Sequence, residues 1–328
     1  MRKLIQTLSS LIHFRKTIEA IVNQRTRQTI HTIHQLNSHL FSIEENTHKV
    51  LLESKKNLLK EKCQHCQEKG VTAERYCNDE VIITLTTYKE RLQEVHLTIE
   101  SIMQGTIKPN RIILWLAEGE YDANDLPIFL RKQMKRGLEI RYCKDLRSYK
   151  KIIPALKLFP DACIVTIDDD LLYEPDILEH LLLSYRKYPT CVSACRTERI
   201  KTDDNGIPLE YNKWDLLSHT QEPSHYNFLT SGGGTLFPPH ILPLETQNEK
   251  IFMKLAPETD DVWLNAMLLL GKVKVAKAFT HNPNGSDYVA NESPYVKTLW
   301  SENKLGRNDM QLQSVWNHYG LTLYDRHQ

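Results

Sequence analysis

Three consecutive carboxylates, Asp168, Asp169 and Asp170, are the residues of this chain best suited to chemistry. They follow an apolar run at 164–167 whose β-branched composition is typical of a strand buried on both faces. Three adjacent negative charges repel one another, so a positive charge should offset them. Mg²⁺ or Mn²⁺ would do so, because both prefer carboxylate oxygens and substrate phosphates. The alternative is an acidic turn whose Asp residues only cap the helix expected to follow.

A second acidic cluster, Asp260 and Asp261, lies where another helix is expected to begin. Pro257 suits the first position of that helix, and an apolar run continues to Gly271. Carboxylates in a first helical turn interact favourably with the helix dipole, which would explain them as caps. An Asp at a helix start beside a bound substrate is also well placed to accept a proton, so both interpretations stay open.

A run of three glycines, 232–234, lies between two apolar, strand-like segments. Glycine lets the backbone approach a ligand closely, although the same run could form only a bulge or a tight bend. Its place between strands, and not in a linker, favours the ligand interpretation.

The region after residue 79 alternates between strand-like and helix-like segments. Strands are expected at 81–85, 111–116, 138–142 and 163–167. Such alternation with short turns predicts an α/β fold with a doubly wound, mostly parallel sheet flanked by helices. Ligands bind such sheets at the carboxyl ends of the strands, where the acidic triplet lies. The chain has no G-x-G-x-x-G after its first strand and no G-x-x-x-x-G-K-[ST], which argues against a dinucleotide dehydrogenase and a P-loop NTPase.

Residues 1–69 contain no Gly, Pro, Trp or Tyr, so a long helix is expected there. We therefore predict two parts, a helical arm at 1–78 and a catalytic domain at 79–328. The interrupted heptads of the arm suit a coiled coil that self-associates. Its basic balance, 12 Lys and Arg against 6 Asp and Glu in residues 1–70, suits a segment lying on an anionic membrane. A helical hairpin packed on the domain is the third alternative.

Composition bounds the partners and the compartment. A net charge of +1 over 328 residues does not suggest a nucleic-acid partner. The seven cysteines show no disulfide framework, which predicts a reducing, cytoplasmic location, with peripheral contact to the inner face of the cell membrane as an option for the arm. No apolar run approaches the ~20 residues that span a bilayer. Cys63, Cys66 and Cys77 lack a fourth zinc ligand at a suitable spacing, so thiols are favoured over zinc.

The ordered set of these features resembles the GT-A glycosyltransferases, in particular the family-2-like enzymes of bacterial surface-polysaccharide assembly. The resemblance is carried by the strand ending in the triplet, the glycine run, Asp260 and Asp261 opening a helix, and the segments VIITLTTYKERL, RSYKKIIPAL and APETDDVW. It covers about residues 80–310 and leaves out the arm.

The resemblance implies a nucleotide diphospho-sugar donor, with a UDP-sugar expected first, and a bound Mn²⁺ or Mg²⁺. Asp168 and Asp170 would hold the metal, with His281 as a third contact, and Asp168 would also approach the nucleoside. Further donor contacts would come from Thr86, Tyr88, Arg91, Lys150, Gly233 and Gly234. A solvated lysine on a helix face is the alternative for Lys150.

The resemblance also implies how the sugar is transferred. Asp261, or failing it Asp260, would deprotonate a hydroxyl of a glycan or lipid-linked glycan acceptor for inverting attack on the sugar. Inversion rests on these two residues, because one fold can host either stereochemical outcome. Two alternatives remain, a nucleotidyltransferase acting on a sugar phosphate and a non-catalytic sugar-binding interaction protein.

Overall fold

The computed structural model describes residues 2–121, 125–282, 287–291 and 308–323, with side chains given before residue 35 only at 25, 26, 32 and 33. Contacts divide the chain into two units, residues 1–57 and 58–328. The last turns of the first helix carry Leu59 and Cys63, which are buried within the second unit. The helical arm at 1–78 and the catalytic domain at 79–328 stay predictions.

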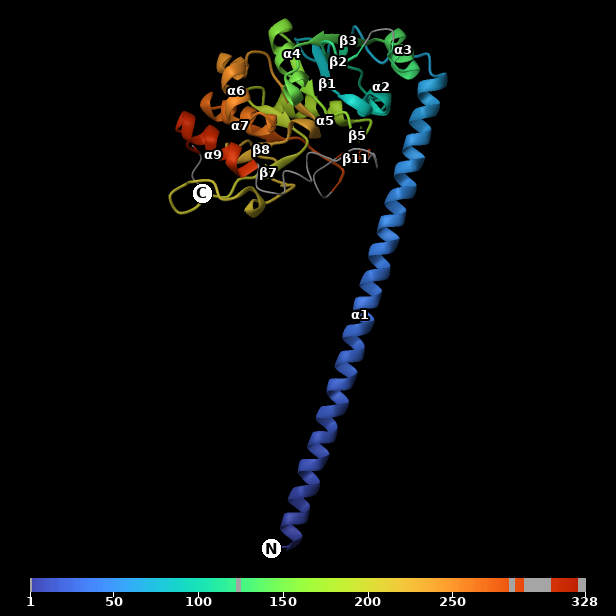
Figure 1. Cartoon of the computed structure of the whole chain (residues 1–328), viewed down its shortest axis with the longest axis vertical. Helices are drawn as coiled ribbons and strands as arrows, with labels where there is room; N and C mark the ends of the chain where they lie inside the picture. The colour runs from blue at the N-terminus through green and yellow to red at the C-terminus, as the bar shows by residue number, and fades with distance from the viewer. Residues whose placement is uncertain (1, 122–124, 283–286, 292–307, 324–328) are drawn as a thin grey trace. The chain divides into compact units, whose positions relative to one another are not determined.

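The first helix, α1, runs from Arg2 to His65, as the absence of helix breakers predicts (Figure 1). Its apolar side chains remain at least half exposed at Ile33, Leu36, Leu40 and Phe41. No helix in the described residues combines the length and hydrophobicity needed to cross a membrane. Self-association and membrane contact of this helix stay predictions.

The second unit is built on a seven-stranded sheet in the order β10-β6-β9-β4-β1-β2-β3. Its neighbours pair in parallel except at β9, which lies antiparallel between β4 and β6. The predicted mostly parallel α/β sheet is therefore confirmed. The strands are β1 Val81–Thr86, β2 Arg111–Ala117, β3 Leu138–Cys143, β4 Cys163–Thr166, β6 Val192–Ala194, β9 Thr235–Phe237 and β10 Val275–Lys277.

Helices cover both faces of this sheet. Successive strand residues point to opposite sides, and because both sets are apolar, each face needs a layer of helices over it. Ile82 belongs to one apolar core and Ile83 to the other. The core that includes Ile83 is closed by α2 Val95–Met103, α3 Ile128–Lys135 and α5 Ile177–Lys187. The core that includes Ile82 is closed by α4 Ile153–Leu158, α6 Glu249–Leu255, α7 Asp260–Leu270 and α9 Asn308–Tyr319 (Figure 1).

Three of the four strands outside this sheet were not predicted, and the fourth lies in the strand-like segment before the glycine run. One of the three corrects the local structure after the acidic triplet. The expected order was strand, acidic turn, helix, but β5 Leu171–Tyr173 comes between the triplet and α5. It pairs antiparallel with β11 Tyr288–Ala290, and β7 Thr197–Arg199 pairs antiparallel with β8 Asn227–Leu229. The helix expected to begin at Pro257 begins at Asp260.

Candidate active site

The two acidic clusters lie together at the carboxyl edge of the sheet, joined by a lysine. Lys151 ends a 3-10 turn at Arg147–Lys151 and is 5% exposed. Its Nζ lies 2.7 Å from Asp168 Oδ1 and 3.0 Å from Asp260 Oδ2. The end of β4 and the first turn of α7 therefore share one buried cation, although they are far apart in the sequence.

A second cation holds the middle of the triplet. Arg91, in the 3-10 turn Lys89–Gln93 after β1, places Nη1 2.8 Å from Asp169 Oδ1 and 2.9 Å from Asp170 Oδ2. Thr87 Oγ1 donates to the other oxygen of Asp169 at 2.6 Å, and the Asp169 side chain is only 7% exposed. Asp168 and Asp170 keep 41% and 30% of their side-chain surface exposed. The outer two carboxylates can therefore reach a ligand, whereas Asp169 has a structural role.

Positively charged side chains balance only part of the negative charge of the two acidic clusters. Four carboxylates pair with Arg91 and Lys151, and Asp261 lies beside them, so these seven groups carry more negative than positive charge when ionised. Burial, and then the charges of its two triplet neighbours, raises the pKa of Asp170 to about 6. Burial, and then the charge of Asp260, raises the pKa of Asp261 to about 6. From the sequence, a bound cation was expected to offset the negative charge of the triplet. In the structure two side chains do part of it.

Asp260 and Asp261 differ in their surroundings. Burial opposes ionisation of Asp260, but the adjacent Lys151 ammonium holds the pKa of this carboxyl below its ordinary value. Asp261 is half-buried and receives the Ser231 backbone N–H at 2.7 Å, with Ser231 Oγ 2.6 Å from the same oxygen. A base works best when its pKa lies near the working pH. Of the two carboxylates, Asp261 therefore has the higher affinity for a proton, and its role as a base stays a prediction.

The glycine run packs directly against the triplet. A Cβ on Gly232 would lie 1.8 Å from Asp168 Oδ2, and one on Gly233 would lie 2.6 Å from Arg196 Cβ. Gly234 has φ +92° and has Ile177 Cδ1 2.7 Å from where its Cβ would stand. Contacts within the protein thus account for these glycines. Ligand contact by Gly233 and Gly234 remains a prediction.

Substituting Gly232 with Ala should lower activity more than stability. The clash falls on the far end of the Asp168 side chain, which can rotate away, but this rotation breaks its bond to Lys151. Steady-state kinetics and thermal denaturation measure the two effects. Gly271→Ala is the control, since its nearest contact would be an ordinary 3.4 Å. Equal activity in the two variants would contradict the packing argument.

Tyr88, Thr86 and Lys150 were also expected to contact the sugar donor, and their surroundings differ. Tyr88 lies under the Arg91 guanidinium, 5.5 Å from ring centroid to Cζ, and so belongs to the same site. Thr86 donates its hydroxyl to the Trp115 carbonyl at 2.9 Å. Lys150 is buried and pairs with Asp145 at 2.7 Å, so its ammonium already has a carboxylate partner.

His281 lies with a different group from the one expected. Its Nε2 is 2.6 Å from Asp176 Oδ2, within a cluster completed by His180 and Asp287. Among the described residues, no grouping with metal-binding spacing joins His281 to the triplet. The thiol of Cys77 lies near Asp79 and Cys163.

Sequence analysis missed Lys151 and Ser231, the two residues that organise the site. Lys151 follows another lysine, as solvated lysines often do, and only the fold buries it. Tyr173 was also missed: its hydroxyl accepts the Asp168 backbone N–H at 2.9 Å and donates to the Gly232 carbonyl. The one available signal was the position of Lys151 directly before the apolar run 152–156.

Comparisons with known proteins give a likeness of fold only. No protein-family profile matches the chain, and no curated protein matches it by sequence. A crystal structure of S. aureus TarS 1-349 aligns with TM-score 0.42 and 11% identity over 64% of this chain and 60% of that one. Another crystal structure of S. aureus TarS aligns with TM-score 0.42 and 13% identity over 66% of this chain and 37% of that one. The chain thus spans less than two thirds of either structure. Similarity at this level supports no inference about function.

Proposed function

We propose that this chain is a glycosyltransferase. It would transfer a sugar from a nucleotide diphospho-sugar to a glycan or lipid-linked glycan in cell-surface polysaccharide assembly. The observation that carries the proposal is the meeting of two acidic clusters around Lys151 at the ligand-binding edge of an α/β sheet. One cluster offers exposed carboxylates, and the other offers a half-buried carboxylate with a raised pKa.

A divalent cation, Mg²⁺ or Mn²⁺, fits this site because the carboxylates outnumber the cations. Asp168 and Asp170 would hold it, since both remain partly exposed while Asp169 is buried against Arg91. When bound, the cation supplies positive charge to the diphosphate leaving group. Lys151 and Arg91 keep the carboxylates in place by their bonds to one oxygen of each.

Asp261 would take the proton from the acceptor hydroxyl. Ser231 fixes one oxygen of Asp261 through its backbone N–H and hydroxyl. The ionised neighbour Asp260 raises the proton affinity of Asp261, and Lys151 keeps that neighbour ionised. Direct attack by the activated hydroxyl then inverts the configuration at the sugar carbon.

Product analysis with purified chain tests this proposal. We expect a nucleotide diphospho-sugar to yield the nucleoside diphosphate, with Mn²⁺ or Mg²⁺ required and EDTA inhibiting. Asp170→Asn should reduce the rate at least about 10²-fold, within the range for lost transition-state charge stabilisation. Asp161→Asn is the matched control, because Asp161 is 88% exposed and pairs only with His240 among the contacts described. Pyrophosphate release from a nucleoside triphosphate and a sugar phosphate would instead identify a nucleotidyltransferase.

A further inference from the structure

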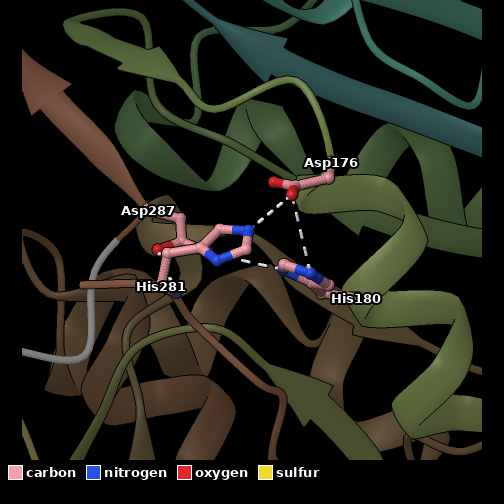
Figure 2. A group of neighbouring side chains, drawn as sticks. All are labelled: Asp176, His180, His281 and Asp287. Carbon is pink, nitrogen blue, oxygen red and sulfur yellow. Dashed lines mark hydrogen bonds and ion pairs between the residues drawn. The ribbon is translucent and has the colours of Figure 1, made fainter. Parts of the chain in front are cut away.

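A compact group of two histidines and two aspartates lies outside the site described above. Asp176 occupies the N-cap position of α5 without a side-chain capping bond, and His180 follows one turn later on the same side of the helix. His281 and Asp287 come from the chain between β10 and β11. Figure 2 shows the four side chains pointing toward one another. One ligand atom from each lies within 4.8 Å of all the others.

The distances are close to those of a metal site. His281 Nε2 lies 2.6 Å from Asp176 Oδ2, His180 Nε2 lies 3.7 Å from the same oxygen, and His180 Nδ1 lies 3.4 Å from Asp287 Oδ2. In a tetrahedral zinc site with bonds of about 2.0–2.1 Å, neighbouring ligand atoms are about 3.4 Å apart. Because His180 can offer the ion only one of its two ring nitrogens, small rotations of the side chains are needed to bring one atom of each residue to this geometry.

Buried polar atoms without hydrogen bonds give independent evidence for a ligand. Asp176 Oδ1, His180 Nδ1 and Asp287 Oδ2 are all buried and have no hydrogen-bond partner. Burying such atoms without a hydrogen bond is costly. His180 Nδ1 and Asp287 Oδ2 lie 3.4 Å apart without forming one, so a group bound beside both would satisfy them. The other oxygen of Asp287 accepts the backbone N–H groups of His281 at 2.8 Å and Asn282 at 3.1 Å, which already orients this carboxylate.

We propose that Asp176, His180, His281 and Asp287 bind one Zn²⁺. Imidazole and carboxylate ligands in a set of four suit zinc, whereas Mg²⁺ and Ca²⁺ prefer oxygen ligands alone. The His281 side chain is 57% exposed, which gives the ion access from solvent. This site differs in ligands and in metal from the one proposed for the sugar donor.

The zinc would fasten the strand pair that supports the acidic triplet. It would join the start of α5 to the segment before β11, which pairs with β5. Beyond β11, the Asn291 backbone N–H donates to the Asp170 carbonyl at 2.7 Å. Metal binding at His281 would thus stabilise the fold next to Asp170, because binding free energy adds to the stability of the native state.

Zinc binding to untagged, metal-stripped protein tests the proposal without any activity assay. The parent protein for this test carries Cys77→Ser, and every variant is made in that background. This change removes the other described group with metal-binding spacing, formed by Cys77, Asp79 and Cys163. We expect one tightly bound Zn²⁺ per chain in equilibrium dialysis and a larger rise in melting temperature with Zn²⁺ than with equal Mg²⁺, which suits the site at Asp168 and Asp170 instead. His281→Ala and Asp176→Asn should each weaken binding at least tenfold.

His240→Ala is the matched control, since His240 is also exposed and lies 2.8 Å from a carboxylate oxygen of Asp161. It should bind zinc as the parent does. Co²⁺ should give the strong visible absorption of a tetrahedral site in the parent and in His240→Ala, and lose it in His281→Ala. Absence of stoichiometric Zn²⁺ binding, or equal affinity in the two histidine variants, would overturn the proposal.

Discussion

Replacing Asp261 with Asn should lower kcat by about 10²–10⁴-fold, the usual contribution of a positioned general base. Asn is nearly the same size and can still accept the Ser231 backbone N–H, so donor binding should not change. Steady-state kinetics with the nucleotide sugar that proves to be the donor measure both quantities. Asp161→Asn, at an exposed carboxylate, should leave kcat unchanged. A kcat within about fivefold of the parent would exclude Asp261 as the base.

The pH dependence gives a second readout of the same residue. Burial and the charge of Asp260 raise the pKa of Asp261 to about 6, and only the ionised form can accept a proton. The wild-type rate should therefore fall as the pH drops through about 6. Asp170, whose pKa is also raised to about 6, remains in Asp261→Asn, so the assay uses saturating Mn²⁺ to keep that metal ligand ionised. Under this condition the residual rate of Asp261→Asn should lose the acid limb. An acid limb of the same position in the variant would show that another group titrates.

Replacing Lys151 with Met should lower the free energy of unfolding by about 3 kcal/mol, at the low end for breaking a buried ion pair. The loss is large because Asp260 stays buried without its cation, while Asp168 is exposed enough for water to compensate. Chemical denaturation near pH 7 measures it. Lys150→Met is the control: this side chain is equally buried, but its partner Asp145 is 63% exposed, so its cost should be about 1 kcal/mol or less.

The stabilisation that Lys151 gives to the fold should decrease at low pH. The lysine lowers the pKa of Asp260 in the folded state, so its stabilisation is present above the ordinary value of 3.8 and is lost as the pH falls through the folded value. The difference in the free energy of unfolding between wild type and Lys151→Met should therefore become smaller at acid pH. Equal costs for the two lysine variants would contradict the central position given to Lys151.

The sequence predicted the fold where the elements are long and locally determined. The breaker-free stretch became α1, and the apolar runs at 81–85 and 111–116 became β1 and β2. Three-residue strands such as β5 and β11 were missed because so few residues show no periodicity, and their pairing depends on partners distant in the sequence. The antiparallel insertion of β9 between β4 and β6 is likewise decided by tertiary packing.

The sequence pointed to the carboxylates and to Arg91 of the candidate site, but not to Lys151. Asp168 and Asp261 stand at the end of a strand and the start of a helix, where sequence patterns are informative. The burial of Lys151 depends on the whole fold, so no local pattern marked it. His281 was expected to join the triplet but lies with Asp176 and His180. The i, i+4 spacing of that Asp and His on one helix was a signal in the sequence that went unused.

The central claim is that a divalent cation, shared with a nucleotide diphosphate, balances the excess negative charge of the acidic site. Thermal denaturation with a panel of nucleotide sugars, with and without Mn²⁺, tests this claim in the wild type and in Asp170→Asn. We predict that at least one nucleotide sugar raises the melting temperature of the wild type only when Mn²⁺ is present, and that Asp170→Asn shows no such rise. An equal rise without metal or in Asp170→Asn, or no rise with any nucleotide sugar, would contradict the claim.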